Sequence, residues 1–255
     1  MGDAKPAPLR KRDRLRARMR RYVDVPLSVR TSDLPKRVAS ALVMLAAVAV
    51  AIAIGGVVLE TFIYLVALAA FCEFARLALR AARTFATRAI GLLTGAAYIG
   101  LAAYFVARLD LYHLIAVLGV VIFTDTCAYF SGRAIGGPKI APSISPSKTW
   151  AGLFGGMAGS GLWLALFMAI THNSGDYVRI ADDFGMAPVE AAGWVMVGAM
   201  LAVAAQAGDF FESWLKRKAK MKDSSNLIPG HGGVFDRIDG MLPVVLIVGL
   251  LSGMA

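Results

Sequence analysis

Long apolar runs separated by short polar connections make up the chain from residue 38 onward. A helix that crosses a bilayer needs about 17 to 25 predominantly apolar residues. The pattern therefore predicts seven transmembrane helices, at Val38–Ile54, Val57–Leu79, Ala89–Val106, Leu111–Phe130, Ala151–Ile170, Ala191–Gly208 and Met241–Ala255. The last run is short enough to be tilted, to be partly re-entrant or to begin earlier. We expect an all-α polytopic membrane protein.

Composition agrees with this pattern, because 58% of the residues are apolar and 17% are charged, against about 25% charged in soluble domains. Most of the formal charge of +10 lies at the start of the chain, where residues 1–37 hold twelve Lys or Arg and four Asp, a net of +8. We expect two parts, a basic cytoplasmic N-terminal arm at 1–37 and a transmembrane catalytic domain at 38–255. The arm is either a solvated segment that fixes orientation or a short helix on an anionic membrane surface.

Basic residues in the connections predict the orientation. The connections at residues 80–88, 131–150 and 209–240 are rich in Lys and Arg, whereas residues 171–190 carry one Arg against four Asp or Glu, a net of −3. Cytoplasmic loops of membrane proteins are enriched in Lys and Arg. We therefore expect the N-terminus in the cytoplasm, the C-terminus outside, and the polar loops on the cytoplasmic side.

The predicted loop after the sixth span carries the densest polar run, GDFFESWLKRKAKMKDSSNLIPGHGGVFDRID. If the helix continues past Asp209, Glu212 and Lys216 follow on its face. Asp236 and Asp239 share a face if a helix begins after the glycines. Carboxylates at two helix ends suit Mg²⁺, which takes one or two carboxylates and completes its shell with water and phosphates. Glycine N–H groups beside a helix start are also free to approach an anion. The loop predicts metal-assisted phosphate chemistry.

A second polar run, FTDTCAYFSGRAIGGPKIAPSISPSKTWAG, follows the fourth apolar run. Asp125 lies near the cytoplasmic end of an apolar helix, where an ionisable group is costly and indicates function. Hydroxyls and a cation follow, at Ser143, Ser145, Ser147, Lys148 and Thr149, between prolines that stiffen the segment. The segment GRAIGGPK lacks Walker A spacing and no strand is predicted before it, so a P-loop NTPase is discounted.

The first run, from Ser213 to Asp239, reads S-W-L-K-R-x4-K-D-x-S-x2-I-P-x-H-G-G-V-x-D-R-I-D. Position by position it resembles the signature of the phosphatidate cytidylyltransferases, also called CDP-diacylglycerol synthases. The run DTCAYFSGR…SPSKTWAG resembles the same family's second block, usually DTGAYF and SPKKTWEG. It departs at Cys127, Ser147 and Ala151. The two blocks cover about a quarter of the chain.

This resemblance implies a reaction of CTP with phosphatidic acid, assisted by Mg²⁺, that gives CDP-diacylglycerol and pyrophosphate. The family's paired metal-binding aspartates fall on Asp209 and Asp236. Together with the charges, the resemblance assigns catalytic roles to Asp209, Lys222, Asp223, Asp236, Arg237 and Asp239, with Asp223 and Asp239 as auxiliary ligands. Contacts to phosphate or nucleotide are expected from Ser145, Lys148, Thr149, Lys216, Arg217 and His231, although His231 alone fits a turn cap equally well. Asp125 either lines the cavity for the lipid headgroup or pairs with Arg133.

Three alternatives stay open on the sequence. One is a related cytidylyltransferase acting on another lipid phosphate, such as an ether lipid, and one is a catalytically weak paralogue. The third is a transporter, for which Glu60 and Glu73 inside an apolar run are the best support. The expected partners are CTP, phosphatidic acid and the bilayer, with no nucleic acid; a homodimer is expected only from the resemblance. The expected location is the bacterial inner membrane, with the active site facing the cytoplasm.

Overall fold

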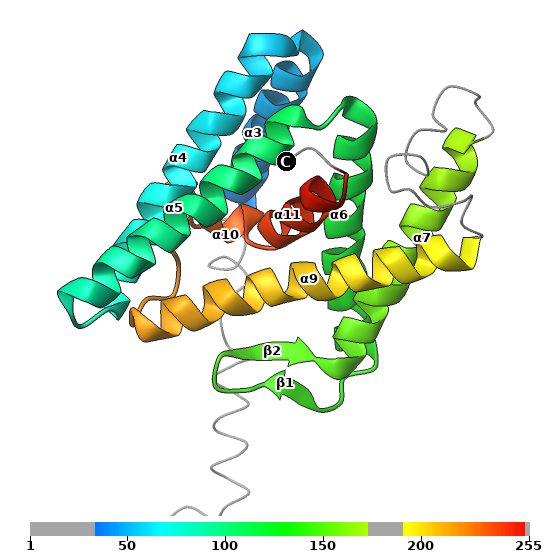
Figure 1. The fold of residues 1–255 in the computed structure, drawn as a ribbon. Helices are drawn as coiled ribbons and strands as arrows, with labels where there is room; N and C mark the ends of the chain where they lie inside the picture. The colour runs from blue at the N-terminus through cyan, green and yellow to red at the C-terminus, as the bar shows by residue number, and fades with distance from the viewer. Residues whose placement is uncertain (1–33, 173–190, 253–255) are drawn as a thin grey trace, which may run out of the picture.

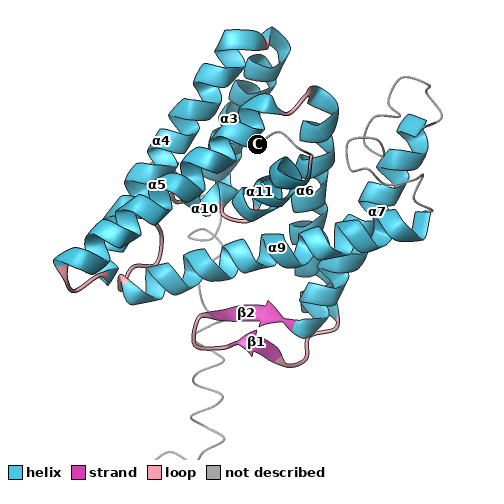
Figure 2. Cartoon of the chain, viewed as in Figure 1, coloured by secondary structure: helices cyan, strands magenta, loops and turns pink. Residues whose placement is uncertain are grey.

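The computed structural model describes residues 34–172 and 191–252, and this part of the chain is mostly helical (Figures 1 and 2). Its helices are α3 (Leu34–Ile54), α4 (Gly56–Ala81), α5 (Phe85–Arg108), α6 (Leu111–Ala134), α7 (Trp150–His172), α9 (Ala191–Lys218), α10 (Phe235–Ile238) and α11 (Met241–Leu251). Six of them, α3 to α7 and α9, are long and apolar enough to cross a membrane. The prediction of an all-α polytopic membrane protein is confirmed.

The seventh predicted span is a short buried helix. α11 has 11 residues and is therefore about 16 Å long at 1.5 Å per residue, roughly half of a 30 Å hydrocarbon core. Leu242, Val244 and Val245 are buried, and the helix packs on α5 and α9, in the middle of the fold (Figure 1). The described structure thus has six long spans, with a short helix in place of the seventh, and the outward position of the C-terminus stays a prediction.

Glycines allow α6 and α7 to pack closely along their length. A β-carbon at Gly156 would lie 3.0 Å from the carbonyl oxygen of Thr124, and one at Gly159 would lie 3.1 Å from that of Phe123. The glycine-rich start of α7 therefore serves contacts within the chain. Small residues have this role in membrane helix packing generally.

Two apolar clusters hold the helices together. One joins α5, α6, α7, α9 and α11 around Phe105, Val120 and Val244. The other joins α4, α5, α9, α10 and α11 around Phe74, Leu77 and Phe235, with the Phe74 and Phe235 rings edge to face at 5.7 Å. The second cluster matters for function because it anchors α10, which carries Asp236, onto α4.

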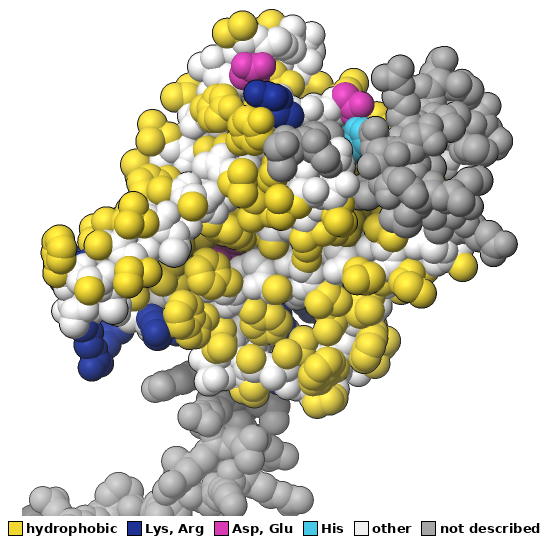
Figure 3. All heavy atoms as spheres, in the orientation of Figure 1, with side chains coloured by type: hydrophobic (Ala, Val, Ile, Leu, Met, Phe, Trp, Pro, Cys, Tyr) yellow, Lys and Arg dark blue, Asp and Glu magenta, His cyan; other side chains and the backbone are white. Residues whose placement is uncertain are grey.

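The outer surface is apolar, as a membrane protein requires. Figure 3 shows hydrophobic side chains spread over the face formed by α4, α5 and α9, with Lys and Arg side chains at its lower edge near the ends of α4 and α5. Large apolar side chains such as Val43, Leu93 and Met200 are exposed. Lipid tails would cover such side chains in a bilayer.

One element was not predicted from the sequence. Between α6 and α7 the chain forms an antiparallel hairpin of β1 (Lys139–Ala141) and β2 (Ser145–Thr149). Figure 2 shows it below α9, and β2 contacts both α7 and α9. The hairpin places Lys148 beside α9.

Part of the expected organisation lies outside the described residues. The basic arm at 1–37 falls mostly on residues 1–33, and the acidic connection at 171–190 falls mostly on residues 173–190. Both expectations stay predictions.

Candidate functional site

The long helix α9 supplies the first half of the site. It continues to Lys218, ten residues beyond the predicted end of the apolar run, so Asp209, Glu212 and Lys216 do share a helical face. Lys216 Nζ lies 2.7 Å from Oε2 of Glu212, one turn away, and both side chains are largely buried. The conditional prediction that the helix continues past Asp209 is confirmed.

The hairpin brings a cation to this face. Nζ of Lys148 in β2 lies 2.5 Å from Oδ2 of Asp209 in α9, and each side chain is about one-fifth exposed. The same ammonium lies 4.8 Å from the ring centroid of Phe210. A charge-assisted contact of this length between half-buried groups is strong, so strand β2 and helix α9 are joined at the site.

Asp236 in α10 supplies the second half. Its carboxylate accepts hydrogen bonds from Lys216 Nζ at 3.1 Å, from the Ser224 N–H at 3.1 Å and from the Gly233 N–H at 2.9 Å. Burial alone would raise the pKa of Asp236, but the neighbouring Glu212 carboxyl, the Gly233 N–H and the Lys216 charge outweigh it and lower the pKa to about 2. Asp236 is therefore ionised at neutral pH.

Asp239 connects the two halves. It lies beside both Asp209 and Glu212, and Glu212 in turn lies beside Asp236. Burial, and then the negative charge of Asp209, raise the pKa of Asp239. Asp209 and Asp236, the predicted metal pair, are thus linked through Asp239 and Glu212. We call these four carboxyl groups the acidic row. Sequence reasoning placed Asp239 in an auxiliary role and did not place Glu212 in the site.

Asp125 faces the same cluster from α6. It lies within electrostatic range of Asp209, Lys148 and Arg237, while the Arg133 guanidinium contacts the Tyr129 hydroxyl instead. No ion pair joins Asp125 to Arg133 among the described residues, and a place for Asp125 beside the lipid headgroup stays a prediction. Four segments of the chain therefore converge here.

The other predicted catalytic and substrate-binding residues have varied surroundings. Arg217 Nε donates to the Ile144 carbonyl oxygen in the hairpin, and Arg237 donates to the His231 carbonyl oxygen. Lys222 and Asp223 are exposed. The His231 Nδ1 lies 2.8 Å from the Ser40 hydroxyl of α3. The predicted roles of these groups stay predictions.

Ser145 and Thr149 mark the two ends of β2 and are buried. The Thr149 hydroxyl accepts a hydrogen bond from the Gly152 N–H at 3.0 Å. This contact satisfies an N–H group in the first turn of α7, a capping function. The geometry therefore shows a structural use for Thr149, and the predicted substrate contacts of both residues stay predictions.

The glycine loop differs from expectation in one respect. The glycine N–H groups were expected to be free to approach a substrate anion, but that of Gly233 donates to a protein carboxylate, as do two N–H groups that follow it. The Gly233 N–H donates to Asp236, and the Val234 and Phe235 N–H groups donate to Glu73 of α4 at 3.1 and 2.7 Å. Glu73 was missed as a site residue, although an acidic residue within an apolar run was a signal for it.

We expect Gly233→Ala to disturb this loop. A β-carbon there would overlap with Ser224 Oγ and with Oε2 of Glu73, and overpacking of this kind costs about 1–3 kcal/mol. Gly100→Ala in α5 is the control, because a β-carbon there has open space and alanine is the better helix former. Thermal unfolding in detergent measures both. Equal unfolding midpoints for the two variants would contradict the tight packing at Gly233.

The acidic row offers carboxyl oxygens, the type of ligand that Mg²⁺ takes from proteins. Four buried or half-buried carboxyl groups, those of Asp209, Glu212, Asp236 and Asp239, are accompanied by two lysines. Oε1 of Glu212 is buried without a hydrogen-bond partner among the described residues. In that part of the chain, no group of three or more His, Cys, Asp or Glu side chains is placed so that it could hold a metal ion together. Mg²⁺ does not need such a group, since it usually takes one or two carboxylates together with water and substrate phosphates.

An apolar groove of about 440 Å³ adjoins the acidic row. Phe74, Tyr98, Phe211 and Pro243 are among its lining residues, and so is Gly208. A β-carbon at Gly208 would collide with the Asp239 carbonyl oxygen, so the groove reaches the backbone of the site itself. Phe211 in its lining is 39% exposed.

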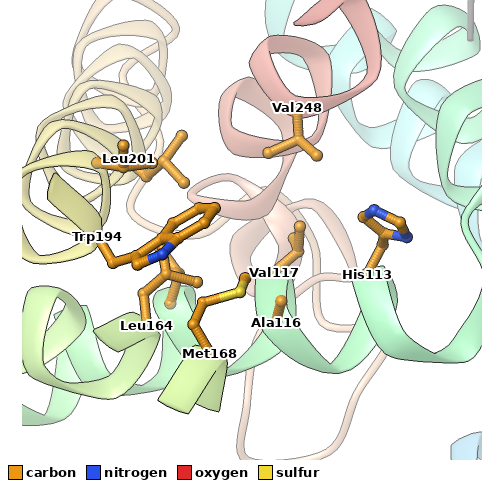
Figure 4. A pocket seen from close by; sticks show the side chains of 10 residues that line it. His113, Ala116, Val117, Leu164, Met168, Trp194, Leu201 and Val248 are labelled. Atoms are coloured by element: carbon orange, nitrogen blue, oxygen red, sulfur yellow. The ribbon is translucent and has the colours of Figure 1, made fainter. Parts of the chain in front are cut away.

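A second cavity, of about 40 Å³, is separate from this site. Figure 4 shows it lined by His113, Trp194, Met168 and apolar side chains of α6, α7, α9 and α11. His113 precedes Asp125 by twelve residues on α6, which is about 18 Å along the helix axis. This cavity has no part in the chemistry of the acidic row.

Fold and site together define a multi-pass membrane protein with one compact cluster of acidic and basic groups. Comparison with known proteins narrows this class. The sequence model of the cytidylyltransferase family matches residues 97–254. Because the match covers more than half of the chain, the chain belongs to the cytidylyltransferase family.

Individual relatives carry a more specific name. The chain is 38% identical over 143 residues to the phosphatidate cytidylyltransferase of Brucella suis, an alignment that covers 54% of this chain and 46% of the relative. The enzymes of that name from Haemophilus influenzae and Pseudomonas aeruginosa are 37% and 39% identical over 53% and 52% of this chain, and over 45% and 44% of their own lengths. The chain spans about half the length of the curated relatives it matches.

Proposed function

We propose that this protein transfers the CMP group of CTP to phosphatidic acid, giving CDP-diacylglycerol and pyrophosphate. The observation that carries the proposal is the meeting of Asp209, Asp236 and Asp239 with Lys148 and Lys216, from three segments of the chain, beside an apolar groove. Acidic groups for a metal, cations for phosphates and an apolar surface for acyl chains are the parts that this reaction needs. The family membership and the named relatives support the same reaction.

The chemistry follows from the charges of the reactants. An oxygen of the lipid phosphate forms a bond to the α-phosphorus of CTP, and the bond from that phosphorus to the α,β-bridging oxygen breaks. Pyrophosphate leaves with the electron pair of the broken bond. Because the attacking oxygen is already anionic, no side chain has to remove a proton from it. The main barrier is the repulsion between two anionic substrates, so positioning and charge stabilisation dominate.

The side chains of the site meet these demands in different ways. Lys148 and Lys216 carry positive charge toward the acidic row, and Arg217 and Arg237 lie at its border. Asp209 and Asp236 are the residues that would hold Mg²⁺, and Asp239 lies beside Asp209. When bound, the ion supplies charge neutralisation for the phosphates. The groove lined by Phe74, Tyr98 and Phe211 would receive the apolar part of the lipid.

The experiment that tests this proposal compares two classes of lipid phosphate as acceptors. The purified protein in mixed micelles is incubated with CTP labelled in the α-phosphate and with either phosphatidic acid or an ether-linked dialkylglycerol phosphate. Transfer of label to the organic phase with phosphatidic acid, abolished by EDTA and restored by Mg²⁺, supports the proposal. Transfer of label to the ether lipid but not to phosphatidic acid would instead indicate a cytidylyltransferase that acts on ether-lipid phosphates. No label with either lipid contradicts a cytidylyltransferase activity.

We also propose that the site faces the cytoplasm of a bacterial inner membrane. The support is the concentration of Lys and Arg in residues 80–88, 131–150 and 209–240, and the bacterial source of the named relatives. In sealed vesicles, product should form only when CTP is on the side that bears the N-terminus. Product from CTP confined to the other side would contradict this orientation.

A further inference from the structure

Glu73 is an acidic side chain in the C-terminal third of a membrane-spanning helix, α4, and only 6% of its surface is exposed. A carboxylate in such a place is costly unless hydrogen bonds satisfy it. Four donors do so. The Ser224 and Ser225 hydroxyls lie 3.0 and 2.5 Å away, and the Val234 and Phe235 N–H groups lie 3.1 and 2.7 Å away.

All four donors belong to one loop, residues 224–235, which is 151 to 162 positions away in the sequence. The loop's serines contact Glu73 at one end, and the backbone at the start of α10 contacts it at the other. One carboxylate thus closes the loop by holding both of its ends. The aromatic contact between Phe74 and Phe235 fixes the same two segments.

Ser224 links this carboxylate to the acidic row. Its hydroxyl donates to Glu73 while its N–H donates to Asp236. Asp236 itself follows directly after Phe235, whose N–H Glu73 accepts. Glu73 therefore constrains the Asp236 carboxylate in two ways, through Ser224, which bonds to both, and through the backbone of Phe235, which precedes Asp236.

We propose that Glu73 is a positioning residue that holds the loop 224–235, and with it Asp236, in the geometry that phosphoryl-type transfer requires. The proposal rests on the proposed function only in assigning Asp236 to the reaction. Glu73 itself lies behind the loop and contacts its backbone and hydroxyls, so it acts through Asp236. This reading gives Glu73 a different task from the transport role that an intramembrane carboxylate first indicates.

Two substitutions of Glu73 distinguish the effect of its side-chain length from the effect of its charge. Glu73→Gln keeps the length but turns one acceptor oxygen into an NH₂ donor, which would face N–H and hydroxyl donors. Glu73→Asp keeps the charge but shortens the side chain by one methylene, so it cannot span both ends of the loop. Glu60→Gln is the matched control, because Glu60 lies on the same helix and is exposed.

The first readout does not depend on activity. Hydrogen–deuterium exchange of the full-length protein in detergent reports on peptides that cover residues 224–236. We expect the Val234 and Phe235 amides to exchange at least about tenfold faster in both Glu73 variants. Their hydrogen bonds to Glu73 are lost or weakened there, so the loop opens more easily. Peptides from α6 and the Glu60→Gln protein should exchange as the wild type does.

The second readout is kinetic. A displacement of about 1 Å in a positioned group can cost on the order of a hundredfold in rate. We expect kcat to fall by that order in both Glu73 variants and the Mg²⁺ concentration for half-maximal rate to rise. The KM for phosphatidic acid should change less than threefold, roughly the scatter of a neutral substitution.

The outcomes separate the two proposals. Faster loop exchange with a lower kcat in both variants supports the positioning role. Unchanged loop exchange overturns it, as does full activity of Glu73→Asp, or an equal rise in exchange across α6 and the loop, which would mean general destabilisation. If the wild type transfers no label, the proposed function fails, while loop exchange still decides whether Glu73 holds the loop.

Discussion

Replacing Asp209 or Asp236 with Asn is expected to lower turnover by on the order of a hundredfold or more, the usual loss when a charge-stabilising group is removed. Asn keeps the size and one acceptor oxygen but removes the full negative charge that a hard cation needs. The double variant should be little slower than either single one, because residues that act as a unit are not additive. CTP-dependent pyrophosphate release across a Mg²⁺ titration measures this.

The structure predicts an asymmetry between the two variants in stability. Asp236 is held by Lys216 and by the N–H groups of Ser224 and Gly233, so an Asn amide group would face donors there. Asp209 is bound through Lys148 at a more exposed position. We therefore expect Asp236→Asn to lower the unfolding midpoint more than Asp209→Asn does. Near-normal turnover in either variant would end the assignment of a metal pair, and Glu60→Gln controls for loss of an acid on an exposed surface.

Replacing Lys148 with Met is the second large effect that we expect. Met keeps most of the apolar stem and removes the ammonium that lies 2.5 Å from Asp209. Loss of one partner leaves a half-buried carboxylate without its cation and removes a positive charge from the phosphates. We expect kcat/KM for CTP to fall by about a hundredfold, the size seen for charge-stabilising groups.

A double-mutant cycle shows how Lys148 acts. If Lys148 works through Asp209, the loss caused by Lys148→Met becomes small in the Asp209→Asn background. If it contacts phosphate independently, the two losses add. Lys139→Met is the control, since Lys139 lies in the same hairpin, is exposed and contacts only the Ser147 carbonyl oxygen, at 3.4 Å. A normal kcat/KM for Lys148→Met would remove the hairpin from the proposed site.

The apolar spans and the helical face of α9 were predictable because periodicity and run length are local properties. Six of the seven apolar runs became long helices, and the spacing of Asp209, Glu212 and Lys216 was enough to place them on one face. The hairpin was not predictable, because its segment is short, rich in Pro and Ser, and without alternation of apolar and polar residues. The last run became a helix of 11 residues that packs on α5 and α9. The length of an apolar run does not reveal whether protein or lipid will cover it.

Contacts between distant segments account for the rest of the candidate site. The contact of Lys148 with Asp209 joins positions 61 residues apart, and those of Glu73 join positions more than 150 apart. Patterns within the loop identified Asp236 and Arg237 as polar groups that need partners, but they could not name Glu73 as the partner of the glycine loop. The intramembrane position of Glu73 indicated a role and left its nature open.

The reach of the Glu73 contacts also bears on how the protein is made. Contacts between residues far apart in sequence form late, because the entropy of closing a long loop must be overcome first. Domains generally acquire their structure as the chain emerges from its N-terminal end. Residues 224–235, which contact Glu73 in α4, and helix α10, which carries Asp236, are synthesised after α4 and α9. The acidic row can therefore assemble only when nearly the full length of the chain has been synthesised. Chains released early would therefore enter the membrane with their apolar helices formed and without an assembled acidic row.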